Sequence, residues 1–405
     1  MICCYHYHMS TTNIPVTVLC GFLGAGKTTL LRHLLASPRT GRAAVLVNDM
    51  AELNVDARLL EGAIVSADEE LVELSNGCIC CTLREDLLRE IARLASLGRF
   101  DRILVESTGV AEPLPIAETF AYQDEEGVKL SDIARLDAIV TVVDAGDFLE
   151  RIDEAEALDD LGMATGEDDD RNLADLLVEQ VEGSDILVLN KCDAADPERL
   201  DRIESVLARL RPGVRILRAT RSQVDPDLLL DTAAHDVARD ERTPGWLSEA
   251  LASSGSESDE YGISSFVYRA RRPFHPVRLM AFLEEGGFDG ILRAKGWAWI
   301  ASRGEEAAHL QQAGGSISID PAGPWLSAFP AHELAPEEKE ELERLSEGPW
   351  GDRRQELVLI GQDLDVDGFR QRLDACLLDE REMAAGPKAW SKLPDPLPAW
   401  EEEAA

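Results

Sequence analysis

Three cysteines lie within four residues of one another in the segment NGCICC, at Cys78, Cys80 and Cys81. Thiolates are ligands that Zn²⁺ and Cu⁺ prefer. Because a strand would turn Cys81 away from the other two, the three can bind one ion only where the chain turns, and Gly77 permits a turn. Three ligands leave a fourth coordination position open, which favours metal transfer over a closed structural site. An inert buried group of cysteines and a redox switch are the alternatives.

A phosphate-binding loop is the second candidate site. The segment GFLGAGKT matches the pattern G-x-x-x-x-G-K-[ST] between an apolar run and a helical pattern. In such a loop, backbone N–H groups point at phosphate oxygens. Lys27 would then reach the β and γ phosphates, and Thr28 would bind Mg²⁺. The residues expected around the phosphates are Gly21, Gly24, Ala25, Gly26, Lys27, Thr28 and Thr29.

The segment NKCD predicts which base the nucleotide carries. Asn190, Lys191 and Asp193 follow directly after an apolar run. The Asp193 carboxylate can accept hydrogen bonds from N1–H and the exocyclic amine of guanine, a pairing that adenine does not offer. Asn190 would serve the O6 side of the base, and the stem of Lys191 would pack over the ring. We therefore expect GTP rather than ATP, although the same four residues also suit an ordinary turn.

The segment ESTG closes another apolar run at Glu106. A carboxylate at this position can hold the Mg²⁺ shell or position a water molecule. Gly109 allows the loop to follow the γ-phosphate. The alternative for this segment is a helix N-cap at Ser107 or Thr108.

Six apolar runs alternate with helical patterns such as 82–97 and 171–181. Continuous apolar strands alternating with helices predict an α/β fold with a doubly wound, mainly parallel sheet covered on both faces. Polar side chains at the ends of the runs would line one edge of the sheet, where such folds bind ligands. The runs are 16–20, 43–47, 103–105, 138–143, 186–189 and 214–217.

The sequence changes in character after the small and acidic stretch LASSGSESDE. Short strand-like runs with helices at 276–285 and 366–378 then predict a smaller α+β domain. We expect the final segment PDPLPAWEEEAA to be disordered. The predicted parts are a tail at 1–13, a nucleotide-binding domain at 14–245 with an acidic surface insertion at 150–171, a linker at 246–262, an α+β domain at 263–385 and an acidic tail at 386–405.

The charge balance narrows the classes of partner. The 405 residues include 77 Asp and Glu against 40 Lys and Arg, a net charge of −37. Such a surface repels phosphate backbones and anionic lipid, so we expect neither a nucleic-acid partner nor membrane docking. No window approaches the roughly 18 apolar residues of a membrane span, and the first residues do not resemble a secretory signal. The expected compartment is the cytoplasm, which suits the use of crowded cysteines for metal or redox chemistry.

The motifs GFLGAGKTT, NGCICC, ESTG and NKCD, in this order, resemble the CobW family of P-loop GTPases, relatives of the hydrogenase and urease nickel-insertion GTPases. The longer segments DRILVESTGVAEPLPIAETF and LRAKGWAWIA are similar to its zinc-starvation branch, often called YciC-like or ZigA-like. The resemblance spans roughly residues 14–380. It implies a P-loop NTPase domain followed by a CobW C-terminal domain.

The resemblance further implies a GTPase that uses GTP and Mg²⁺ and carries Zn²⁺ to a client protein. By position, Asp49 and Glu52 match an acidic switch segment near metal, and Glu106 matches a Walker-B-like residue. Catalysis would then rest on Lys27, Thr28, Glu106 and Asp49, and metal binding on Cys78, Cys80, Cys81, Glu52 and Thr28. A second copy of the chain is a further candidate partner.

Two other functions remain open. Other branches of the same family suggest delivery of cobalt or iron. A GTP-dependent protein-interaction switch, with structural cysteines, belongs to a different class. Many relatives carry a His-rich stretch that buffers metal, whereas this chain has none and contains 7 His in all. We therefore do not expect high-capacity zinc storage.

Overall fold

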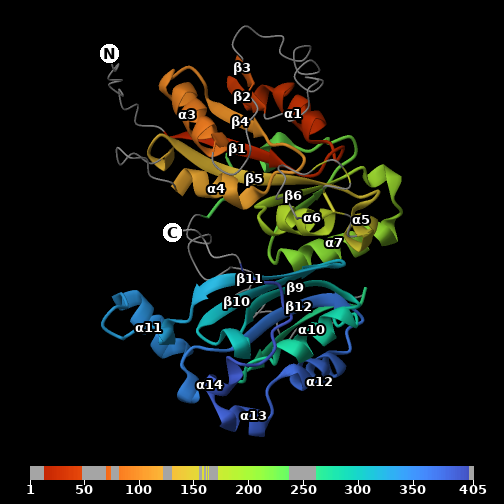
Figure 1. Cartoon of the computed structure of the whole chain (residues 1–405). Coiled ribbons are helices and arrows are strands. Elements are labelled where there is room, and N and C mark those ends of the chain that lie inside the picture. The colour runs from red at the N-terminus through yellow and green to blue at the C-terminus, as the bar shows by residue number, and fades with distance from the viewer. Residues whose placement is uncertain are drawn as a thin grey trace. The chain divides into compact units, whose positions relative to one another are not determined.

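The computed structural model of the chain (Figure 1) describes residues 13–47, 70–73, 82–121, 130–154, 157–158, 161, 163, 172–236 and 261–400. The chain forms two compact units, residues 1–245 and 246–405, and each is described by itself. Within the described ranges, helices that are both long and apolar enough to cross a lipid bilayer do not occur.

The first unit is built on a parallel sheet, which confirms the predicted fold class. Its strand order is β3-β2-β4-β1-β5-β6-β7, and each neighbouring pair is parallel. Six of these strands match the six apolar runs of the sequence, whereas β3 was not predicted. The strands are β1 (Ile14–Cys20), β2 (Ala43–Val47), β3 (Glu70–Glu73), β4 (Arg102–Glu106), β5 (Ala134–Asp144), β6 (Ile186–Asn190) and β7 (Arg215–Arg218).

Helices supply apolar side chains to both faces of this sheet. Leu31 of α1 packs in a buried cluster with Leu19 of β1, while Ile91 of α3 packs in another with Val18 of the same strand. Because neighbouring strand residues point to opposite faces, the continuous apolar runs are explained by burial on both sides. The helices are α1 (Lys27–Leu35), α3 (Thr82–Ser96), α4 (Pro113–Ala121), α5 (Phe148–Glu154), α6 (Leu173–Glu182) and α7 (Pro197–Leu210).

The strand ends that carry polar residues are aligned across the sheet. Glu106 lies opposite Leu19 and Val47, and Asn190 lies opposite Asp144. Since all these strands are parallel, their carboxyl ends share one edge, the edge at which doubly wound folds bind ligands.

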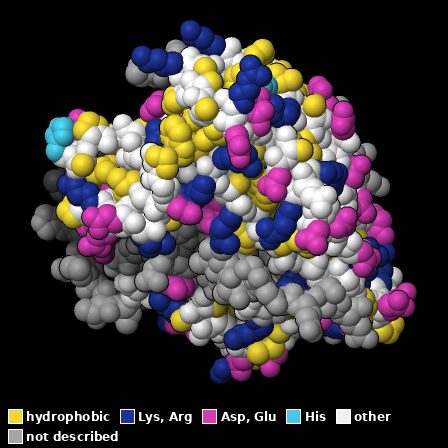
Figure 2. Space-filling view, turned by 90° about the horizontal axis from the view of Figure 1, so that it is seen from below, with side chains coloured by type: hydrophobic (Ala, Val, Ile, Leu, Met, Phe, Trp, Pro, Cys, Tyr) yellow, Lys and Arg dark blue, Asp and Glu magenta, His cyan; other side chains and the backbone are white. Residues whose placement is uncertain are grey.

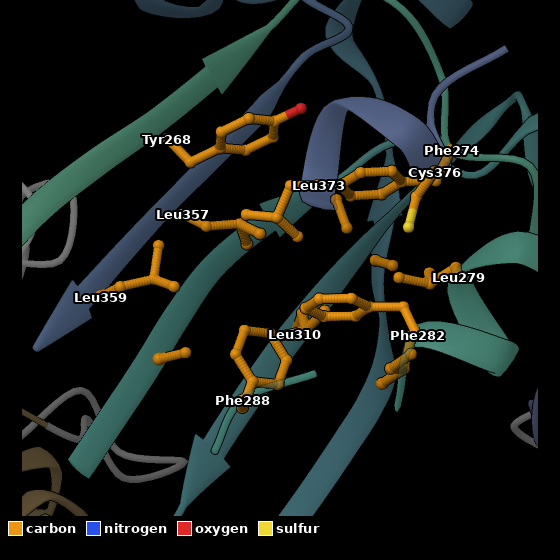
Figure 3. Packing of buried hydrophobic residues seen from close by; sticks show 14 of the residues in the cluster. Tyr268, Phe274, Leu279, Phe282, Phe288, Leu310, Leu357, Leu359, Leu373 and Cys376 are labelled. Atoms are coloured by element: carbon orange, nitrogen blue, oxygen red, sulfur yellow. The ribbon is translucent and has the colours of Figure 1, made fainter. Parts of the chain in front are cut away.

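The second unit is α+β, as predicted, with an antiparallel sheet in the order β11-β10-β9-β12-β8. Figure 3 shows Leu357 and Leu359 of β12 facing Phe282 of α10 and Leu373 of α12 in the core. The strands are β8 (Ile263–Ala270), β9 (Ile291–Ala298), β10 (Glu306–Ala313), β11 (Ser316–Pro324) and β12 (Gln355–Gln362). The helices are α10 (Pro276–Glu284), α11 (Pro336–Leu345), α12 (Val366–Cys376), α13 (Glu380–Ala385) and α14 (Pro387–Trp390).

The expectation of a disordered C-terminal tail is wrong as far as Trp400. The Asp395 carboxylate pairs with Arg303 at 2.8 Å, and Leu397 is buried in the core of the second unit. The Trp400 indole donates to the carbonyl of Ile319 at 2.9 Å. The prolines and acidic residues suggested disorder, but two apolar anchors hold this segment on the domain.

The other predicted boundaries fall largely outside the described residues. This holds for most of the N-terminal tail, the linker and the acidic insertion. The insertion begins inside α5, where Ile152 is buried, so its first turn belongs to the folded unit.

Candidate functional site

The loop between β1 and α1 has the backbone shape that a phosphate-binding loop needs. Gly21 and Gly26 have φ angles of 128° and 117°, a region that favours glycine. A Cβ at Gly21 would lie 2.3 Å from the Val142 carbonyl oxygen, and one at Gly26 would lie 2.4 Å from Nδ2 of Asn190. Conformation and close packing therefore both require glycine at these two positions.

Lys27 carries its charge inside this loop. Its side chain is 8% exposed, and Nζ donates to the carbonyl oxygens of Gly21 at 2.7 Å and Phe22 at 3.2 Å. The ammonium group is thus held by carbonyl oxygens of the same loop whose N–H groups would surround a phosphate.

Thr28 and Glu106 meet at the carboxyl edge of the sheet. The Thr28 hydroxyl donates to Oε1 of Glu106 at 2.6 Å, and Glu106 is buried. The two residues lie 78 positions apart in the sequence, and they meet because β4 pairs with β1 directly before the phosphate loop. A hydroxyl and a carboxylate are the hard oxygen ligands that Mg²⁺ prefers, so this pair fits that ion.

The loop after Glu106 lies against the phosphate loop. A Cβ at Gly109 would be 2.5 Å from the side chain of Leu23 and 2.9 Å from its backbone nitrogen. Ser107 donates to the carbonyl oxygen of Thr108 and to the sulfur of Cys20, and α4 begins only at Pro113. The hydroxyl of Ser107 therefore does not cap that helix, and Gly109 is required by close packing.

Gln180 of α6 is a positioning residue that the sequence analysis missed. Its side chain is 1% exposed and donates from Nε2 to the carbonyl oxygens of Gly109 and Ala111, both at 3.0 Å. The available signal was a glutamine one helical turn after Leu176 and Leu177, on the apolar face of α6. Such a residue is buried and needs partners.

The side chain of Asn190 connects the phosphate loop to the loop after β7 by hydrogen bonds. Its side-chain amide donates to the Ala25 carbonyl at 2.8 Å and to the Ser222 hydroxyl at 3.0 Å, and its Oδ1 accepts from the Ser222 backbone at 2.7 Å. The residue is 2% exposed. Binding of this side chain to the O6 side of a base stays a prediction; the structure shows it bonded between the phosphate loop and the loop after β7.

Lys191 and Asp193 lie at the surface beside Asn190. Lys191 has a positive φ of 58°, and its Nζ pairs with Asp144 at the end of the neighbouring strand. Asp193 is exposed. Cys192 between them donates to the Leu189 carbonyl at 3.1 Å, and burial raises the pKa of its thiol. The Asp193 carboxylate is thus exposed to solvent, while the contacts of Lys191 and Cys192 hold the loop in place.

Of the remaining predicted residues, Gly24 in the phosphate loop and Thr29 in the first turn of α1 are exposed. Five others lie outside the described part of the chain. These are Asp49, Glu52, Cys78, Cys80 and Cys81. The described ranges themselves contain no group of three His, Cys, Asp or Glu side chains able to hold a metal ion. Cys20 is buried in β1, as expected for a core residue, and burial raises its thiol pKa to about 11.

Comparison with protein families gives two matches, one in each unit. Residues 15–218 match the CobW/HypB/UreG nucleotide-binding domain. Residues 263–377 match the C-terminal domain of the cobalamin synthesis protein CobW. The two matches follow the order expected from the sequence.

Individual relatives extend over both units. The zinc-regulated GTPase metalloprotein activator 1 of Dictyostelium discoideum is 42% identical over 403 residues, covering 96% of this chain and 85% of the relative. The zinc chaperone CobW of Sinorhizobium sp is 31% identical over 308 residues, covering 72% of this chain and 82% of the relative. Among solved structures, Zn(II)-bound YjiA GTPase from E. coli is 23% identical with a TM-score of 0.40, covering 91% of this chain and 100% of that one.

Proposed function

Because the chain belongs to the CobW family of P-loop GTPases, we propose that it is a GTP-hydrolysing metallochaperone. It binds Zn²⁺ through Cys78, Cys80 and Cys81 and passes the ion to a client protein. The names of the relatives, a zinc-regulated GTPase metalloprotein activator and a zinc chaperone, support zinc as the cargo.

One observation carries the proposal, the 2.6 Å hydrogen bond from Thr28 to Glu106. It joins the phosphate loop to the end of β4, the strand that follows the cysteine segment in the sequence. A change at the nucleotide phosphates would therefore act on Glu106, which is connected to the cysteine segment through helix α3.

Strand β3 strengthens this link. Val47 lies opposite Glu73 in β3 and opposite Glu106 in β4, so the two glutamates are two strand spacings apart, about 10 Å. Residues 74–81 connect Glu73 to Thr82, where α3 begins. A helix that connects two parallel strands starts at the edge where the first strand ends. Both attachments of the cysteine segment thus favour a metal site beside the phosphates.

The chain's own residues divide the hydrolytic work. The ammonium group of Lys27 neutralises charge on the β and γ phosphates, and the loop glycines let N–H groups approach them. Thr28 and Glu106 would hold Mg²⁺, which neutralises developing charge on the phosphates when bound. Gln180 fixes the carbonyls of Gly109 and Ala111, which orients the loop beside the γ-phosphate position.

Zinc-dependent hydrolysis tests the proposal. GTP turnover is measured with and without one equivalent of Zn²⁺ in the wild type, in Cys80→Ser and in Cys376→Ala. Zinc should change wild-type turnover, and Cys80→Ser should lose that response while keeping basal turnover, because it removes one thiolate ligand. Cys376 is buried in α12 of the second unit, so its variant should respond as the wild type does. An unaltered zinc response in Cys80→Ser would contradict the role of the cysteines.

A further inference from the structure

The ammonium group of Lys191 is held by a carboxylate on the neighbouring strand. Its Nζ pairs with Oδ2 of Asp144, the last residue of β5, and Asp144 lies opposite Asn190 in the sheet. Figure 2 shows Lys and Arg side chains beside Asp and Glu at several places on the face that it draws, and exposed pairs of this kind contribute little by themselves. The Lys191 pair differs because the Asp144 side chain is only 15% exposed.

The backbone around Asp144 fixes the direction of its carboxylate. Oδ1 accepts from the backbone N–H of Gly146 at 2.9 Å, while Oδ2 pairs with Lys191. The N–H of Ala145 donates to the Asn190 carbonyl at 2.9 Å. The loop after β5 is therefore joined to the NKCD segment both by a backbone hydrogen bond and by an ion pair.

Arg199 of α7 holds this loop from another side. Its Nε donates to the Ala145 carbonyl at 3.2 Å, and its Nη2 donates to the Gly146 carbonyl at 2.9 Å. Its Nη1 donates to the carboxylate of Glu150 in α5 at 2.7 Å. These contacts do not involve Lys191, so the position of Asp144 does not depend on the lysine that it holds.

Both ends of the Lys191 side chain are consequently fixed. The backbone of the residue has a positive φ of 58°, and Asp144 holds Nζ at the tip. A free lysine stem has many rotamers, and a ligand that must order the stem loses affinity. A stem that is already held presents its methylene groups to an aromatic ring without that cost.

The same ion pair keeps Lys191 from neutralising Asp193. Asp193 has the opposite charge, follows Lys191 by two residues and is exposed. An ammonium group that is bound to Asp144 does not compete with guanine donors for the Asp193 carboxylate. The pair therefore bears on both side chains that the NKCD segment offers to a base.

We propose that Asp144 is a positioning residue for the base: it holds the ammonium group of Lys191 so that the lysine stem covers the guanine ring and Asp193 stays open to the base. This inference rests on the proposed guanine-nucleotide site and adds to it a residue outside the NKCD segment. The contacts of Lys27 and Thr28 do not involve Asp144. The effect of Asp144 is therefore confined to ligands that carry a base.

Ligand affinities of the full chain test this inference. Isothermal titration calorimetry with Mg²⁺ compares GDP with inorganic tripolyphosphate, which carries the phosphates of GTP without a base. Asp144→Asn keeps an acceptor for the Gly146 N–H but removes the charge that holds Lys191. It should weaken GDP binding about tenfold, within the range for residues of one hydrogen-bond network, and leave tripolyphosphate binding within about twofold.

Asp147→Asn is the matched control. Asp147 lies in the same loop, but its carboxylate pairs with Arg151 at 2.6 Å. The variant removes a comparable charge and leaves the partner of Lys191 in place. Its GDP affinity should stay within about twofold of wild type.

A double variant shows whether Asp144 acts through Lys191. Lys191→Met keeps an apolar stem but removes the ammonium group that Asp144 binds. Asp144→Asn should weaken GDP binding about tenfold in the wild-type background and less than about twofold in the Lys191→Met background.

The outcomes separate this inference from the proposed function. Failure of the wild type to bind GDP would contradict the guanine site and the role of Asp144 together. Where the wild type binds GDP, the role of Asp144 alone is overturned by any of three results: Asp144→Asn binds GDP as wild type does, it weakens tripolyphosphate binding equally, or it has the same effect in both backgrounds.

Discussion

At the scale of single residues, the NKCD segment separates a buried amide from an exposed carboxylate. Asn190 holds Ala25 and Ser222, whereas Asp193 lies at the surface. The motif thus contributes one residue to the shape of the site and leaves the Asp193 carboxylate exposed, where we propose that it binds the base. The hydrogen bonds of Asn190 were not predictable, because a motif gives the order of side chains but not the direction in which each points.

Asp193→Asn should lower the preference for GTP over ATP by about 10- to 100-fold, since the carboxamide replaces an acceptor of two hydrogen bonds with a mixed donor and acceptor. Competition of GTP and ATP against a fluorescent guanine nucleotide measures the preference.

Asp196→Asn is the matched control for this change. The Asp196 carboxylate caps α7 by accepting from the Arg199 backbone at 2.8 Å, and asparagine caps equally well. It should leave the preference unchanged. Equal competition by GTP and ATP in the wild type would show that the guanine assignment is wrong.

At the scale of elements, helix α6 fixes the loop that follows Glu106. Gln180 lies 71 positions from Gly109 in the sequence, and the two meet only in the folded sheet. The same helix begins at a conventional cap, where Asn172 accepts from the Asp175 backbone at 2.8 Å. The two ends of α6 therefore serve different purposes, one for the site and one for stability.

Gln180→Ala should reduce GTP turnover about tenfold with a smaller change in GTP affinity, because two buried carbonyls lose their donor and the loop loosens. The stability cost should be about 1 to 3 kcal/mol. Steady-state hydrolysis and urea unfolding measure the two effects. Asn172→Ala should cost about 1 kcal/mol but keep wild-type turnover. If both variants lose turnover in proportion to stability, Gln180 has no specific role at the loop.

A second prediction at this scale concerns the contact between α10 and α13. A bidentate pair joins Arg278 to Glu382 at 2.7 and 3.0 Å, and this hydrogen bonding lowers the Glu382 pKa from 4.5 to about 2. A carboxylate with a depressed folded pKa stabilises the fold above its unfolded pKa, and the contribution disappears as pH falls toward the folded value. Stability from this pair is therefore present above pH 4.5 and lost between pH 4.5 and about 2.

Glu382→Gln should lower the unfolding free energy by about 0.5 to 1 kcal/mol at pH 7, a modest value because the pair is partly exposed. The difference from wild type should shrink below pH 4.5, as followed by urea midpoints from tryptophan fluorescence. Glu380→Gln, in the first turn of the same helix, is the control. A difference that stays constant down to pH 3 would contradict the assignment.

The elements also show how far the sequence could predict the fold. The buried strands carry long apolar runs, so their positions and ends were predictable. β3 has only the residues ELVE, which show no strand pattern of their own. Its pairing with β2 is a tertiary contact that the local sequence does not predict. The phosphate loop is contiguous and was therefore recognisable, whereas Gln180 acts on residues far away in the sequence. Trp400 was misjudged because prolines and glutamates surround a side chain that packs.

At the scale of the whole molecule, the account joins a GTPase site to a metal site in one unit of a strongly acidic chain. The nucleotide side rests on the hydrogen bond from Lys27 to the Gly21 carbonyl and on that from Thr28 to Glu106. For the metal side we propose three thiolates in the segment between Glu73, where β3 ends, and Thr82, where α3 begins. If nucleotide binding changes the affinity for zinc, zinc must change the affinity for that nucleotide by the same factor.

The most direct test is therefore the zinc affinity of the wild type, measured by competition with a chromogenic chelator in the presence of a non-hydrolysable GTP analogue, GDP or no nucleotide. The account predicts that zinc affinity differs between the GTP-analogue and GDP states by about 5- to 150-fold, the usual range of allosteric coupling. Zinc must change the ratio of GTP-analogue to GDP affinity by the same factor, and Cys80→Ser must abolish both effects. Equal zinc affinity in all three nucleotide states, or wild-type affinity and coupling in Cys80→Ser, would contradict it.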